Sequence, residues 1–196
     1  MIKKSIIQYV LLCGFYVLSG WATSFAQAVV LTPEEKQWVE AHPAIQLGSD
    51  AYCEPLEFID EMGVHKGMTA DYVALLKERL NLNLVSSPVL PWRVVLEKAQ
   101  SRDLDVLTCA ASTPQREQYL KFTKPYLNCP IVVFARWDAT PLTDLNNLMD
   151  VPVGVVNGYA HHELLERDFP QLNLQPVGSV QEGLEKLIAG EIDAYV

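Results

Sequence analysis

The chain has 196 residues, of which 49% are hydrophobic, and it carries a formal net charge of −9. A chain this acidic repels phosphate backbones and anionic lipid, so nucleic-acid binding and membrane-surface binding are excluded. Its length and hydrophobic content suffice for one large core or two small ones.

The first 28 residues are organised like a secretory signal peptide. Lys3 and Lys4 precede the apolar run YVLLCGFYVLSG, and Ala26-Gln27-Ala28 fits a small-x-small cleavage site. The apolar run is too short to span a bilayer comfortably, and the polar segment WATSFAQA that follows disfavours an uncleaved anchor. We therefore expect export to the periplasm. Loss of 28 residues and two lysines leaves a mature chain of 168 residues with a charge of −11.

The mature chain is predicted to open with a short helix in LTPEEKQWVEAHP. Thr32 is placed as N-cap, Pro33 at the first helical position, and Glu35 three residues after the cap, which is a capping box. Residues 29–43 are accordingly assigned to an N-terminal helix and linker.

Residues 44–130 alternate between strand and helix patterns and are assigned to a first lobe. The helix in TADYVALLKERLNL carries Val73, Leu76 and Leu80 on one apolar stripe. Strands are expected in AIQLGSD, NLVSSPVL and DVLTCAA, a second helix in PWRVVLEKAQS, and a hairpin or loop in PLEFIDEMGVHKG. This order predicts an α/β layer with a mostly parallel sheet.

Residues 131–196 begin a second α/β lobe. Strands are expected in IVVFAR, VPVGVVNG, LNLQPV and IDAYV, helices in HHELLERDF and SVQEGLEKLIAGE, and a loop with room for a short helix in WDATPLTDLNNLMD. LEKAQSRDLDVL, from Leu96, recurs as LEKLIAGEIDAYV, from Leu184, so that Asp105 and Asp193 enter equivalent strands. We interpret the repeat as one helix-strand element present in each lobe; chance similarity between amphipathic helices is the alternative.

Two facing α/β lobes create a cleft beyond the carboxyl ends of their strands, and ligands bind there. The positions just past those ends are Asp50, Tyr52 and Cys53, then Trp92, residues 109–116 and residues 157–162. In STPQR, Thr113 is predicted to cap a helix that starts at Pro114, so free backbone N–H groups and the Arg116 guanidinium form a carboxylate receptor. A helix start with a solvated arginine is the alternative.

These motifs together resemble the type II periplasmic solute-binding proteins of the amino-acid-binding class, bacterial family 3. The resemblance covers nearly all of the mature chain, through LGSDAYCEPLEFID, GMTADYVALLKERLNL, DLDVLTCAASTPQREQYLKFTKPY and VGVVNGYA in the family's order. LTPEEKQWVEAHPAIQLG is more particularly similar to the Venus-flytrap sensor domains of bacterial hybrid histidine kinases. The resemblance implies a two-lobed fold that captures a small carboxylate-bearing ligand for a transporter permease or for a downstream transmembrane kinase module of the same chain.

The resemblance also implies a set of ligand-binding residues, and no catalytic residue, metal or cofactor. Arg116 matches the clamp for the ligand α-carboxylate, and Asp50 lies where the family reaches the ligand side chain. The loop of residues 157–159 is expected to present backbone N–H groups. The full set is Asp50, Tyr52, Trp92, Ala111, Arg116, Asn157, Gly158 and Tyr159.

Departures from the family pattern bear on the ligand. Cys109, Ala110 and Ala111 stand where the family has glycine and then a hydroxyl residue, and Cys53 replaces a common pocket aromatic. In the family, an acidic residue that holds the ligand ammonium follows the last strand by a few residues, whereas this sequence ends at Val196. We therefore expect an incomplete second lobe, and the departures at Cys53 and at residues 109–111 count against a standard amino acid as the ligand.

Two alternatives stay open at this point. An exported enzyme of the dehydratase type would draw its acid or base from His161, His162, Glu163 and Glu57, although no triad, metal set or carboxylate pair emerges. Of the mature cysteines Cys53, Cys109 and Cys129, the last two either form a disulfide or remain plain buried thiols.

Overall fold

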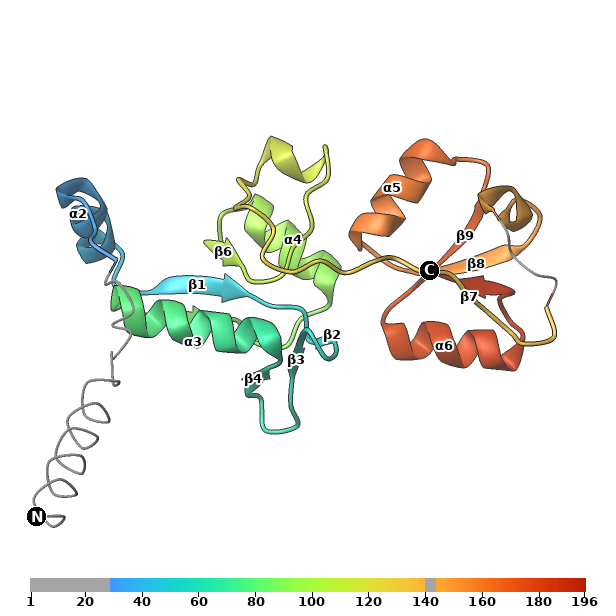
Figure 1. Cartoon of the computed structure of the whole chain (residues 1–196), viewed down its shortest axis with the longest axis horizontal. Helices are drawn as coiled ribbons and strands as arrows, with labels where there is room; N and C mark the ends of the chain where they lie inside the picture. The colour runs from blue at the N-terminus through green and yellow to red at the C-terminus, as the bar shows by residue number, and fades with distance from the viewer. Residues whose placement is uncertain (1–28, 140–143) are drawn as a thin grey trace, which may run out of the picture.

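The computed structural model describes residues 29–139 and 144–196. The predicted signal peptide, residues 1–28, lies outside the described residues, as does the stretch 140–143 of the loop that precedes β8. The described residues form two α/β lobes joined by an extended crossover (Figure 1). None of their helices is long and apolar enough to cross a membrane.

A short helix, α2 (Pro33–Ala41), precedes the first lobe, and its predicted capping box is confirmed. The Thr32 hydroxyl accepts a hydrogen bond from the Glu35 N–H at 3.2 Å, and the Thr32 N–H donates to Glu35 Oε2 at 2.7 Å. No residue of α2 is buried, so local capping and not core packing defines this helix.

The first lobe is built on a parallel sheet in the order β5-β1-β6, as the alternation of strands and helices predicts. Helix α4 buries Trp92, Val95, Leu96 and Ala99 at spacings of three and four residues, which form its apolar face. The elements of this layer are β1 (Ile45–Gly48), α3 (Met68–Leu80), β5 (Leu84–Ser86), α4 (Trp92–Gln100) and β6 (Val106–Leu107).

An antiparallel sheet, β2 (Tyr52–Cys53), β3 (Glu57–Ile59) and β4 (His65–Lys66), is attached to this lobe by one buried carboxylate. Glu57 is fully buried and accepts hydrogen bonds from the Asp50 N–H at 2.8 Å and the Thr69 hydroxyl at 3.0 Å. His65 Nε2 lies 2.8 Å from the same carboxylate, and the Thr108 hydroxyl also donates to it. Glu57 therefore ties together the end of β1, the hairpin, α3 and the end of β6.

Helix α3 forms where predicted, and its apolar stripe is partly buried, since Val73 packs against the buried core cluster of β1 and β5. Thr69 is the buried residue of this helix, and Leu76 of the stripe is 47% exposed. The neighbouring Leu75 is also exposed. Periodicity identified the helix correctly, and of the predicted stripe Leu76 is the residue that stays exposed.

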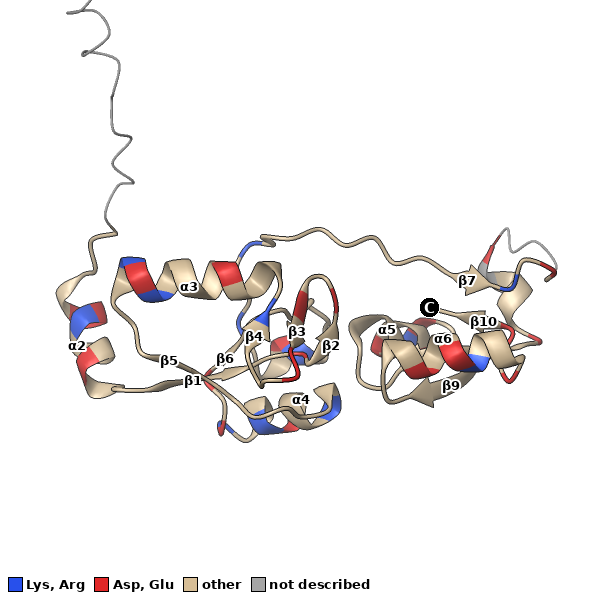
Figure 2. Cartoon of the chain, turned by 90° about the horizontal axis from the view of Figure 1, so that it is seen from below, with Lys and Arg blue, Asp and Glu red and all other residues tan. Residues whose placement is uncertain are grey.

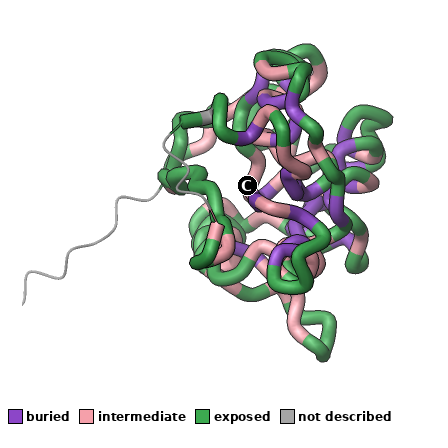
Figure 3. Tube along the Cα trace, turned by 90° about the vertical axis from the view of Figure 1, so that its right-hand side faces the viewer, coloured by how far each residue is buried: buried purple, intermediate pink, exposed green. Residues whose placement is uncertain are grey.

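The second lobe is a four-stranded sheet in the order β7-β10-β8-β9, with β7 antiparallel to the rest. Val153 and Val155 of β8 are fully buried in one cluster with Leu165 of α5, and Val156 packs with Leu187 of α6. Figure 3 views the chain from the side of this lobe and shows buried stretches beside the C-terminus. The elements are β7 (Phe134–Ala135), the 3-10 helix η2 (Leu145–Leu148), β8 (Pro152–Val156), α5 (Ala160–Asp168), β9 (Asn173–Val177), α6 (Val180–Ala189) and β10 (Ala194–Tyr195).

The repeated sequence phrase corresponds to equivalent structure in the two lobes. Each lobe places its first parallel strand in the centre, giving β5-β1-β6 in one lobe and β9-β8-β10 in the other. The Asp105 N–H donates to the Gln46 carbonyl of β1 and the Asp193 N–H to the Pro152 carbonyl of β8, both at 2.9 Å. The two aspartates therefore enter equivalent strands, as predicted from the repeat.

The crossover is anchored at both ends. The Tyr126 hydroxyl donates to the Thr108 carbonyl of the first lobe. The Arg136 guanidinium binds the Ile192 carbonyl and the Asp193 carboxylate of the second lobe, each at 3.0 Å. The strand expected across IVVFAR is shorter than predicted and consists of β7 alone. Residues 131–133 are exposed and run as an extended segment between the two anchors (Figure 2).

Candidate functional site between the lobes

The two lobes meet where the parallel strands of both sheets end. Arg116 and Thr113, after β6, contact Glu163 on α5, while Arg116 also reaches the loop after β8. The Tyr159 hydroxyl of that loop donates to Asp50 Oδ2, after β1, at 2.5 Å. At the strand ends, where the sequence predicts the site, the two lobes are thus joined by direct hydrogen bonds.

Arg116 is at the centre of this set. Its side chain is only 2% exposed, and each nitrogen of the guanidinium has an acceptor. Nε donates to Glu163 Oε1 at 3.0 Å, Nη1 to the Ala111 carbonyl at 3.0 Å, and Nη2 to the Gly158 carbonyl at 2.7 Å. The guanidinium also lies 5.8 Å from the centre of the Trp92 ring. A solvated arginine, the alternative considered from sequence, is therefore wrong.

The turn that positions Arg116 differs from the predicted helix start at Pro114. Thr113 does cap the segment, since its hydroxyl accepts from the Arg116 N–H at 3.2 Å. The regular part is a 3-10 helix of three residues, η1 (Arg116–Gln118). A single turn has little dipole, so the positive charge of the site comes from the guanidinium.

Glu163 supplies the carboxylate that Arg116 binds. Nothing in the sequence indicated that these two residues pair. Glu163 lies in the first turn of α5 with its side chain 12% exposed. One carboxylate oxygen accepts from Arg116 Nε, and the other accepts from the Thr113 hydroxyl at 2.6 Å. The arrangement is a charge-assisted receptor in the first lobe filled by a carboxylate of the second.

Asp50 and Tyr159 form the second polar contact between the lobes. Asp50 Oδ1 accepts from the Tyr52 N–H at 3.0 Å, and Oδ2 accepts from the Tyr159 hydroxyl. Burial raises the pKa of Asp50, and the hydrogen bond from Tyr159 works against that rise by stabilising the carboxylate. Burial and the neighbouring Asp50 charge raise the pKa of Tyr159, so its hydroxyl keeps its proton and acts as the donor.

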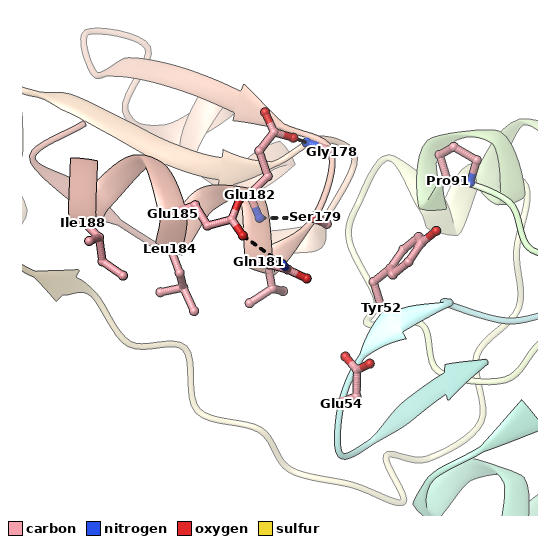
Figure 4. Close-up of a pocket in the computed structure, with 11 residues that line it drawn as sticks. Tyr52, Glu54, Pro91, Gly178, Ser179, Gln181, Glu182, Leu184, Glu185 and Ile188 are labelled. Atoms are coloured by element: carbon pink, nitrogen blue, oxygen red, sulfur yellow. Dashed lines mark hydrogen bonds between the residues drawn. The ribbon is translucent and has the colours of Figure 1, made fainter. Parts of the chain in front are cut away.

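Beside these contacts lies an open pocket of about 780 Å³. Tyr52 and Glu54 of the first lobe face the side chains of α6 across it (Figure 4). The other lining residues are Pro91, Gly178, Ser179, Val180, Gln181, Glu182, Leu184, Glu185 and Ile188. Both lobes therefore line one cavity, which Tyr52 connects to the Asp50–Tyr159 contact.

Residues 45–195 match the bacterial extracellular solute-binding proteins, family 3. The chain belongs to this family. It is 25% identical over 162 residues to the virulence sensor protein BvgS of Bordetella pertussis, which covers 83% of this chain and 13% of that protein. It therefore spans about an eighth of the length of this relative.

Solved structures support the same two-lobed, periplasmic-binding-protein-like fold for this family 3 chain. A histidine kinase sensor domain with similarity to periplasmic binding proteins matches with a TM-score of 0.73 and 25% identity, covering 80% of this chain and 68% of that one. The ancestral amino-acid-binding protein AncCDT-1, a precursor of cyclohexadienyl dehydratase, matches with a TM-score of 0.70 and 20% identity over 81% of this chain and 71% of that one.

The second-lobe loop of this family 3 chain differs from the expected arrangement. Its backbone N–H groups are bonded within the lobe: Asn157 N–H to the Val177 carbonyl at 2.9 Å, Gly158 N–H to His162 Nδ1 at 3.2 Å, and Tyr159 N–H to the Val156 carbonyl at 3.1 Å. The loop therefore offers a carbonyl, that of Gly158, to the first lobe. The Asn157 side chain is exposed and joins none of the interlobe hydrogen bonds described above.

The two carboxylates among the acid-base candidates of the enzyme alternative have structural partners in this family 3 chain. Glu57 is used inside the first lobe and Glu163 by Arg116. Burial lowers the pKa of His161 to about 4, which keeps its imidazole neutral at physiological pH. No group of three or more His, Cys, Asp or Glu within the described residues is arranged to hold a metal ion.

The three cysteines of the described chain are free thiols. The disulfide between Cys109 and Cys129 that the sequence left open is therefore not formed. Burial raises the pKa of Cys53 to about 12 and that of Cys109 to about 11, so both stay protonated. Cys109 replaces a small family residue without adding a charge to the site.

Trp92, predicted as a ligand-binding residue, is also a core residue of the first lobe. It is buried in the α4 core with Val95 and Leu104, and Tyr159 of the second lobe packs against the same cluster. Its ring also lies beside the Arg116 guanidinium. The surroundings of the Trp92 ring therefore include both Tyr159 of the other lobe and the charge of Arg116.

We expect the emission of Trp92 to change when a carboxylate compound binds at Arg116. In a chain that keeps Trp92 as its only tryptophan, any movement of Tyr159 or Arg116 alters the polarity around the ring. A titration followed by emission wavelength measures this. The matched control keeps only Trp137, which is 97% exposed. No change at Trp92 under saturating conditions would make it a core residue alone.

Proposed function

We propose that the chain is a periplasmic Venus-flytrap domain that captures a small, amino-acid-like ligand bearing a carboxylate between its two lobes. The observation that supports this most directly is the binding of a carboxylate by Arg116 Nε and the Thr113 hydroxyl. That carboxylate comes from the opposite lobe, so the receptor faces the space that closes when the lobes approach. A ligand carboxylate would use the same two donors.

Lobe closure is the proposed output of binding. A ligand shifts the equilibrium only as far as it prefers the closed form, so it must contact both lobes. Arg116 provides the contact from the first lobe, and the loop of Gly158 and Tyr159 with the α6 side of the pocket provides the second. The similarity to sensor proteins supports a kinase module as the partner that reads closure. A transporter permease is the other partner to be tested.

The direct test is calorimetry of the whole exported chain with the twenty L-amino acids and with short mono- and dicarboxylates. Small-angle scattering of the chain with each binder then measures compaction. We expect at least one carboxylate compound to bind and, because the empty chain is an equilibrium between open molecules and molecules whose lobes are joined by Glu163, to reduce the mean radius of gyration. Binding without compaction would contradict the flytrap mechanism, and turnover of the compound would favour the enzyme alternative.

Gly158→Val is expected to weaken binding of such a compound about tenfold, because strain at this residue displaces the carbonyl that faces Arg116. Gly158 has φ of +79°, which valine adopts poorly, and its added Cβ would lie 3.5 Å from the Arg93 backbone. Isothermal titration measures the affinity. Gly63→Val is the matched control, because Gly63 has a similar φ of +78° with no neighbour within 4 Å of its Cβ position. Equal affinities in the two variants would remove the loop from the site.

A further inference from the structure

We propose that Glu163 is an internal competitor for the ligand carboxylate, which occupies the Arg116 receptor and must leave before a ligand binds there. This inference rests on the proposed function, because it concerns the same receptor. Glu163 would then set the affinity of the site for the ligand. It would also hold the two lobes together while no ligand is bound.

The first argument is the completeness of the contact. Glu163 uses both carboxylate oxygens, one on Arg116 Nε and one on the Thr113 hydroxyl. The remaining guanidinium nitrogens donate to the Ala111 and Gly158 carbonyls. These bonds use three of the five guanidinium N–H groups, one on each nitrogen. A second carboxylate would therefore have to bind the remaining N–H groups of Nη1 and Nη2 in the same site as Glu163, or replace one of these partners.

The second argument identifies which partner is replaced. The Ala111 and Gly158 carbonyls are neutral backbone acceptors fixed by their segments, whereas Glu163 is a charged side chain on rotatable bonds. An incoming carboxylate that replaced a carbonyl would lie next to the Glu163 charge in a site whose two side chains are 2% and 12% exposed. Like charges this close repel strongly at low solvent exposure. Replacement of Glu163 conserves the charge of the site.

The third argument comes from the position of Glu163 in the second lobe. Its bond to Arg116 joins residues that are 47 apart in sequence, one in η1 of the first lobe and the other in α5 of the second. Apart from the bonds of Glu163 to Arg116 and Thr113, the side-chain contact between the lobes described above is the Asp50–Tyr159 hydrogen bond. Glu163 therefore contributes to holding the lobes together in the way expected of a bound carboxylate, and its removal should favour opening.

The variant Glu163→Ala tests the inference, because the atoms it removes correspond to acetate. Without added compounds, we expect small-angle scattering to give a larger radius of gyration than for the parent chain and Trp92 emission to shift to the red. Sodium acetate at roughly 10 mM, the range for a ligand making few contacts, should restore both signals in a saturable manner. Sodium chloride and acetamide at equal concentrations are the controls for ionic strength and shape.

Two further variants define the outcome. Glu163→Gln keeps the shape without the charge and should open the lobes less than Glu163→Ala. Asp168→Ala, at the end of the same helix with a side chain that is 46% exposed, should match the parent. The inference is overturned if Glu163→Ala is as compact as the parent, or if acetate acts on it no more than on the parent.

The same preparations separate this inference from the proposed function. A carboxylate compound that binds the parent should bind Glu163→Ala about tenfold more tightly, because the internal competitor no longer reduces the fraction of competent receptor. Equal affinity for the two chains would contradict the inference while leaving the proposed function intact. A different outcome is that acetate closes the lobes of Glu163→Ala but no other carboxylate compound binds either chain. That outcome would support the inference and count against ligand capture.

Discussion

Replacement of Glu57 by alanine should lower the free energy of unfolding by about 3–5 kcal/mol. Glu57 is fully buried and accepts hydrogen bonds from Asp50, Thr69 and Thr108, and His65 lies against the same carboxylate. Alanine leaves these donors in a region that water does not reach, and unpaired buried donors are costly. Urea denaturation followed by circular dichroism measures the loss.

Two variants make this result specific. Glu57→Gln retains an acceptor oxygen and the side-chain volume, so it should cost less than Glu57→Ala. Glu61→Ala removes an exposed carboxylate from the same hairpin and should change stability by no more than about 0.5 kcal/mol. A Glu57→Ala midpoint equal to that of Glu61→Ala would show that the buried carboxylate does not organise the first lobe.

Replacement of Arg116 by alanine should weaken binding of a carboxylate ligand at least a hundredfold, which corresponds to about 3 kcal/mol. The substitution should also destabilise the chain, because the Glu163 carboxylate loses its charged partner while its side chain is only 12% exposed to solvent. Isothermal titration and thermal unfolding measure the two effects separately. Arg79→Ala, which removes an exposed charge from α3, is the control for net charge.

The double variant Arg116→Ala, Glu163→Ala separates the two effects of the substitution. It should recover part of the stability lost in Arg116→Ala, because no unpaired carboxylate remains between the lobes. It should not recover affinity, because the receptor charge is absent. Undiminished affinity in Arg116→Ala would remove this residue from the binding site.

The fold was largely predictable because its signals are local. The capping box at Thr32, the alternation of strand and helix patterns, and the repeat that contains Asp105 and Asp193 each depend on residues close in sequence. The same reasoning placed Asp50, Arg116 and Tyr159 near one cleft, because strand ends of parallel sheets gather at one edge. What the side chains do there depends on how the lobes face each other.

The parts that sequence did not predict all depend on contacts between distant segments. Glu163 is 47 residues from Arg116, and its place in the first turn of a helix gives no sign of which lobe its carboxylate reaches. The loop after β8 was expected to present N–H groups, but His162 and the ends of β8 and β9 take them. The apolar stripe of α3 indicates a helix but not what covers it, and Leu76 stays exposed.

The anchors of the crossover limit how far the lobes can separate. Tyr126 holds one end to the first lobe and β7 begins at Phe134, so seven residues lie free between them. A fully extended segment of this length spans about 25 Å at most. Glu163 thus remains tethered near Arg116 even after the lobes open, at an effective concentration that for short linkers is on the order of millimolar. A free ligand competes with this tethered carboxylate for Arg116. It displaces Glu163 only when its concentration, relative to its dissociation constant, exceeds the effective concentration of Glu163 relative to that of the Glu163 contact. Below that ligand concentration the domain does not respond.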